Sequence, residues 1–90
     1  MEAGDDSWTT EAADVATEAA IVGQLLHLHP VQLTLAELIR ELAGEHPSFE
    51  ERDAIERAVR DLVAAGLLHR GDGRLAPTRA ALRLSRLLDR

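Results

Sequence analysis

The chain of 90 residues is long enough for one small domain, and it carries a formal net charge of −6. The absence of cysteine excludes disulfides and thiolate metal sites, and Trp8 and Phe49 are the only aromatic residues available to a core. The acidic start lacks the basic and apolar parts of a secretory signal, and no apolar run approaches the roughly 20 residues that span a bilayer. We therefore expect a cytoplasmic protein with no membrane partner.

Charge is distributed unevenly along the chain. Residues 1–20 contain six acids and no base, whereas residues 69–90 contain six arginines against two aspartates. The basic end is a local feature that the total charge would hide. Residues 1–9 are expected to form a flexible acidic leader and residues 10–90 a single domain. Within the leader, Trp8 would either fold back on the core or anchor another chain.

The first helix is predicted from its apolar spacing. Apolar residues recur every three or four positions from Val15 to Leu26, a pattern that starts after about Thr10 and that Pro30 ends. Residues 31–34 are expected to be a short extended segment.

Two sequences of the form Ser/Thr-x-x-Glu predict where the next two helices begin. In such a capping box, the hydroxyl and the carboxylate each satisfy a free amide of the first turn. The two boxes are Thr34 to Glu37 and Ser48 to Glu51. The helix after Thr34 should stop at Gly44 and the helix after Ser48 at Gly66, since glycine readily ends a helix. The second of these helices should bury Ile55, Ala58, Val59 and Leu62 on one face.

The periodicity then changes to that of a β-hairpin. Two short segments, 67–70 and 74–77, flank the turn sequence Gly71-Asp72-Gly73. Pro77 cannot donate a hydrogen bond to a neighbouring strand, so it should end the second strand or lie on its outer edge. Thr78 is expected to cap a last helix that carries Ala81, Leu84, Leu87 and Leu88.

The segment from Asp53 to Leu68 resembles the third helix and the start of the wing in bacterial regulators of the GntR and MarR type. It has small and β-branched residues before an arginine-rich turn, and then a leucine, three residues, a glycine and an apolar pair. The resemblance covers roughly residues 15–88. It implies a mostly α fold with a small β-hairpin wing. This winged helix-turn-helix would have the order helix, short strand, helix, helix, strand, strand, helix.

The resemblance also implies a partner and a set of contacts. In DNA-binding members of such families, the third helix enters the major groove and the wing touches the flanking backbone. The chain would then be a small transcription-associated protein that binds double-stranded DNA. Its DNA-contacting residues would be Arg52, Arg57 and Arg60 on the third helix, Arg70 and Arg74 on the wing, and Arg79 after it. Acids depart from the family pattern at the start of the third helix and would repel phosphates: Glu50, Glu51, Asp53 and Glu56.

A non-enzymatic protein-interaction module is the alternative function on the same scaffold. Its acidic surface would face a basic partner protein, and the arginines of the third helix would neutralise neighbouring acids. The position of the arginines in space separates the two hypotheses. One continuous positive stripe favours DNA, whereas arginines that are each paired with an acid favour the interaction module.

Catalysis and metal binding receive little support from the sequence. The serines lie in no nucleophile motif, and Gly71-Asp72-Gly73 lacks the Gly-Lys-Ser/Thr ending of a phosphate-binding loop. His27 and His29 are two positions apart on a helix, so their side chains point away from each other. We therefore expect no enzyme, no cofactor and no metal. The small aliphatic core and the apolar stripe on the last helix predict a homodimer through the first and last helices.

Overall fold

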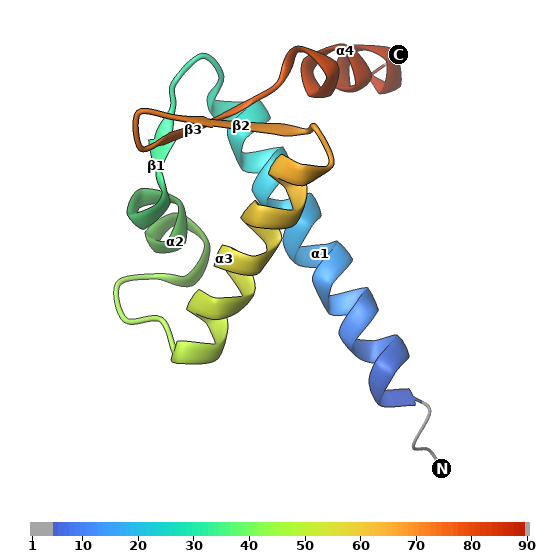
Figure 1. The fold of residues 1–90 in the computed structure, drawn as a ribbon, viewed down its shortest axis with the longest axis vertical. Helices are drawn as coiled ribbons and strands as arrows, with labels where there is room; N and C mark the ends of the chain where they lie inside the picture. The colour runs from blue at the N-terminus through green and yellow to red at the C-terminus, as the bar shows by residue number, and fades with distance from the viewer. Residues whose placement is uncertain (1–4, 90) are drawn as a thin grey trace.

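The computed structural model describes the backbone of residues 5–89 and the side chains of residues 11–89. This part of the chain contains four helices and one three-stranded antiparallel sheet (Figure 1). The predicted mostly α architecture with a small hairpin is therefore confirmed. In chain order the elements are α1 (Asp5–Leu28), β1 (Leu33–Thr34), α2 (Leu35–Ala43), α3 (Phe49–Ala64), β2 (Leu68–Gly71), β3 (Arg74–Pro77) and α4 (Arg79–Leu88).

The helix α1 starts earlier than the apolar spacing predicts. It begins at Asp5 instead of near Thr10, so residues 5–9 of the expected flexible leader have a helical backbone. Acids at the start of a helix complement its dipole, and the alanine-rich sequence that follows has a high helix propensity. Residues 1–4 and the side chain of Trp8 lie outside the part of the chain that the structure describes.

Both predicted capping boxes are confirmed. The Thr34 hydroxyl accepts from the Glu37 N–H at 3.1 Å, and the Glu37 carboxylate accepts from the Thr34 N–H at 2.8 Å. The same reciprocal pair joins Ser48 and Glu51, at 3.0 and 2.9 Å. The helix α2 ends at Gly44, whose φ of 86° lies in the left-handed region that glycine adopts most easily.

We expect Ser48→Ala to lower the free energy of unfolding by about 1 kcal/mol, because it removes the side-chain acceptor of an N-cap. Chemical denaturation followed by circular dichroism measures the change. The matched control is Ser48→Thr, which keeps a hydroxyl and should leave the midpoint nearly unchanged. An alanine variant with the midpoint of the original protein would contradict the capping role.

The sheet has the strand order β1-β3-β2, with β3 at its centre. The turn between β2 and β3 contains two residues, Asp72 and Gly73, with φ values of 56° and 75°. Positive φ at both central residues is the geometry of a type I′ hairpin turn. Gly71 therefore belongs to β2 and not to the turn, and it pairs with Arg74. The strand β3 ends at Pro77, as predicted.

One aliphatic core joins α1, α2, α3 and the sheet. Its fully buried large side chains are Ile21, Leu25, Leu38, Val59, Leu68 and Leu75. Among the described residues, α4 adds only Ala81 to the buried set. Thr78 ties α4 to the end of α3, because its hydroxyl donates to the carbonyl oxygen of Gly66 at 2.7 Å and accepts from the Ala81 N–H at 3.1 Å. The helix α4 thus lies at the edge of the fold (Figure 1).

Candidate nucleic-acid interface

The surface of α3 that faces away from the core has two sides with different neighbours. The helix buries the predicted stripe of Ile55, Ala58, Val59 and Leu62. On one side of this stripe, Ala54 lies against α1. On the other side, Arg52 lies beside α2, and Glu56 and Arg60 lie beside the hairpin. The charged residues of α3 are therefore divided between two surfaces.

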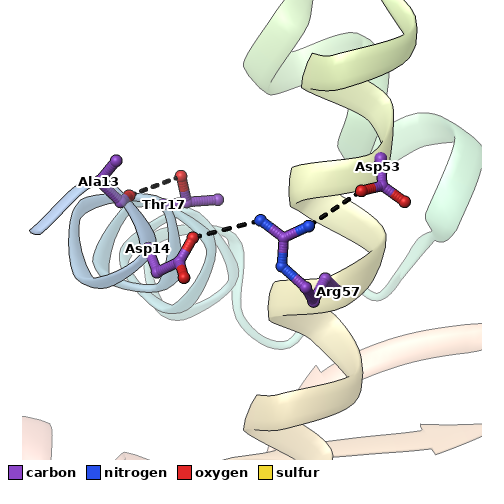
Figure 2. Close-up of polar contacts among 5 residues, drawn as sticks. All are labelled: Ala13, Asp14, Thr17, Asp53 and Arg57. Atoms are coloured by element: carbon purple, nitrogen blue, oxygen red, sulfur yellow. Dashed lines mark hydrogen bonds and ion pairs between the residues drawn. The ribbon is translucent and has the colours of Figure 1, made fainter. Parts of the chain in front are cut away.

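Arg57 lies between α1 and α3, where two carboxylates hold its guanidinium (Figure 2). Its Nη1 donates to Asp53 Oδ2 at 2.9 Å, one turn earlier on α3. Its Nη2 donates to Asp14 Oδ1 at 3.3 Å on α1. The Arg57 side chain is 40% exposed, so water screens these pairs only in part. Arg57 therefore uses its charge within the fold, unlike the groove-facing role that the resemblance implies.

Arg60 and Arg70 line one surface hollow where α3 meets the hairpin. The hollow has a volume of about 380 Å³, and its lining residues are Leu35, Glu56, Arg60, Val63 and Arg70. Two arginines from separate elements thus line the same hollow, together with one acidic residue. No carboxylate of the described residues lies within 4.0 Å of either guanidinium. Glu56 is therefore the acid that opposes an incoming anion at this hollow.

The strand register places Arg70 and Arg74 on opposite faces of the sheet. Residues directly opposite each other in an antiparallel pair point to the same face, and neighbours along a strand point to opposite faces. Arg70 pairs with Leu75, which is buried, so Arg70 lies on the face that covers the core. Arg74 pairs with Gly71 and Thr34 and lies on the outer face. The two arginines expected to act together on the wing are thus separated.

Arg74 belongs to the surroundings of Glu37 at the start of α2. The Thr34 N–H that donates to Glu37 holds the pKa of this carboxyl below its ordinary value of 4.5. The positive charges of Arg74 and Arg40 lower this pKa further, while loss of water contact opposes the shift. The arginine on the outer face therefore stabilises the charged form of a capping residue.

Arg52 shares a second hollow with Arg40, a residue that sequence reasoning missed. This hollow has a volume of about 200 Å³ and lies between α2 and the start of α3. Glu45 comes within 4.0 Å of Arg40 Nε, at the limit of an ion pair. The signal for Arg40 was present in the sequence, because it lies outside the apolar stripe of α2 and hence on its polar face. Arg40, Arg52, Arg60 and Arg70 follow the α2 and hairpin side of α3.

Arg79 lies apart from these four arginines. It is the first residue of α4, which extends from the end of the sheet opposite α2 (Figure 1). Its side chain is exposed. The structure therefore places Arg60 and Arg70 of the expected set in one hollow and Arg52 with Arg40 in another. It leaves out Arg57, Arg74 and Arg79.

The acids at the start of α3 have a structural role. The Glu51 carboxylate accepts from the Ser48 N–H, and Glu51 also lines a hollow between α1 and α3. Negative charge at this end complements the helix dipole. Neither Glu50 nor Glu51 lines the hollow of Arg60 and Arg70, where Glu56 is the carboxylate.

Among the described residues, no group of three or more His, Asp or Glu side chains is placed to hold a metal ion. No helix in the described part combines the length and the apolar character that crossing a membrane requires. Comparison of the chain with protein-family models, curated proteins and solved structures gave no match.

Proposed function

We propose that the chain is a winged-helix domain that binds duplex DNA through α3 and the hairpin. The observation that carries this proposal is the shared hollow of Arg60 and Arg70. A helix that presents arginine beside a basic hairpin matches the arrangement in which a recognition helix enters the major groove and a wing meets the backbone. The element order is also the one expected for a winged helix.

The chemistry of these side chains suits phosphate. A guanidinium is always charged at neutral pH and offers paired N–H groups that match two phosphate oxygens. Arg60 and Arg70 would contact the backbone on one side of the groove. Arg52 and Arg40 would extend the contact toward α2. Such contacts bind any sequence and weaken as salt is added.

One observation favours the alternative, a module that binds a basic partner protein. Arg57 is paired with two acids, as that hypothesis requires of the arginines on α3. Glu56 also adds a carboxylate where DNA would approach. Arg60 and Arg70, each beyond 4.0 Å from every carboxylate of the described residues, weigh against the alternative.

Fluorescence anisotropy with a labelled duplex of mixed sequence tests the proposal. We expect binding at about 50 mM salt that weakens steeply as the salt concentration rises. Each neutralised phosphate contributes about 0.9 to the slope of log affinity against log salt concentration. No binding at this salt, with the protein at high micromolar concentration, would overturn the proposal. The interaction module would then be the better hypothesis.

We expect Glu56→Gln to tighten binding to duplex DNA several-fold, because it removes the carboxylate beside Arg60 and Arg70. The matched control is Asp61→Asn, which makes the same change in total charge on α3 but outside this hollow. The same salt titration measures both variants. Equal tightening by the two would show that total charge alone governs binding, contrary to the proposed interface.

A further inference from the structure

Phe49 is the first residue of α3, and its side chain is 81% exposed. This is the largest exposed fraction among the large apolar side chains that the structure describes. The fold thus leaves most of an aromatic ring in water, and the ring would gain free energy if another apolar group covered it. The position of Phe49 on α3 indicates what that group is.

Phe49 lies on the same face of α3 as the residues of the hollow that Arg60 and Arg70 line. Glu56, Arg60 and Val63 are the residues of α3 in that hollow. Phe49 precedes Glu56 by seven residues and Arg60 by eleven, which are about two and three turns of an α-helix. Residues separated by whole turns point to the same side, so this face carries an aromatic ring at one end and arginine about 16 Å further along the helix axis.

The charges around Phe49 separate its end of the face from the phosphate-contacting end. The first turns of α3 carry Glu50, Glu51 and Asp53 against Arg52 alone. Carboxylates repel phosphates, whereas the base edges in the major groove carry no net charge. If Arg60 contacts the DNA backbone, the part of the duplex that meets Phe49 is therefore a base edge.

We propose that Phe49 selects duplexes with thymine below the start of α3, through contact with the 5-methyl group. This inference rests on the proposed binding of DNA. In the major groove, the thymine methyl is an apolar group among hydrogen-bond donors and acceptors. A ring that covers those polar groups without replacing their hydrogen bonds to water costs free energy, whereas a ring that covers the methyl gains it. Phe49 thus favours a pyrimidine with a 5-methyl group over the other bases.

Two pairs of duplexes that differ only in the 5-methyl group test this inference by fluorescence anisotropy. In the first pair, uracil replaces every thymine of an alternating A·T duplex, which removes the methyl groups and keeps every hydrogen-bonding group. We expect the thymine duplex to bind about fourfold more tightly, the usual effect of burying one methyl group. In the second pair, 5-methylcytosine replaces cytosine in an alternating G·C duplex and should tighten binding by a similar factor.

Variants of the exposed ring assign the effect to Phe49. Phe49→Ala should abolish the preference in both pairs, and Phe49→Leu, which keeps a large apolar side chain, should retain part of it. Val31→Ala is the matched control, because it shortens an exposed apolar side chain (56%) outside α3 and should keep both preferences. All three variants should keep the salt dependence of the original protein, since no arginine is changed. Circular dichroism confirms that each variant is folded.

The possible outcomes distinguish this inference from the proposed function. Salt-dependent binding with equal affinity for both members of each pair would overturn the role of Phe49 and leave the proposed function in place. Preferences that persist in Phe49→Ala would also overturn it, because they would arise from the effect of the methyl groups on the shape of the DNA. No binding to any of the duplexes would overturn the proposed function, and this inference with it.

Discussion

Replacing Arg60 and Arg70 together with alanine is expected to weaken binding to duplex DNA about 60-fold at about 0.1 M salt. Each lost phosphate contact lowers the slope of log affinity against log salt concentration by about 0.9. At this salt concentration, that change corresponds to an affinity about eightfold weaker. The slope itself should fall by about two units. Because phosphate contacts read no bases, unrelated duplexes should lose affinity equally.

Two single variants on the hairpin provide the control for this prediction. Arg70→Ala should cost about eightfold at about 0.1 M salt, whereas Arg74→Ala should change affinity by less than about twofold. The variants remove the same charge four residues apart, but the register places the side chains on opposite faces. If Arg74→Ala proved as harmful as Arg70→Ala, the DNA would not lie on the α3 side of the hairpin.

Leu75→Ala is expected to lower the free energy of unfolding by about 2–5 kcal/mol, the usual cost of a large cavity in a core. Leu75 is 1% exposed and lies on the central strand, with β1 on one side and β2 on the other. A domain of this length has a total stability of roughly 5–13 kcal/mol, so the variant should lose a large share of it.

Urea denaturation at constant protein concentration measures this loss. Val31→Ala serves as the control, because that valine is 56% exposed and its truncation should cost at most about 0.5 kcal/mol. A loss below about 1 kcal/mol for Leu75→Ala would mean that the sheet contributes little to the core. The hairpin would then give Arg70 no fixed position.

Local sequence patterns predicted the starts of α2 and α3 and the end of β3. Thr34 and Ser48 are the N-caps that the capping boxes predicted, and β3 ends at Pro77. These predictions are correct because each depends only on residues within one turn of a helix or at one end of a strand. Apolar spacing predicts a start of α1 near Thr10, later than the observed Asp5, since it gives no signal in the polar first turns of a helix.

The grouping of the site residues could not be predicted, because it depends on register and on contacts between distant segments. With a turn of three residues, Arg70 would oppose Arg74 on one face; the two-residue turn pairs Arg70 with Leu75 instead. A shift of one position reverses every side chain of a strand. The partner of Arg57 on α1 lies 43 residues away, and no local pattern joins the two.

The contact between α1 and α3 has a consequence for how the domain would meet DNA. Both helices contribute to one core, and the pair of Arg57 with Asp14 joins them at the surface. The face of α3 that carries Arg60 would therefore have one fixed position before DNA is present. Binding would then require little ordering of the backbone, and most of the ordering would be in the side chains of Arg60 and Arg70.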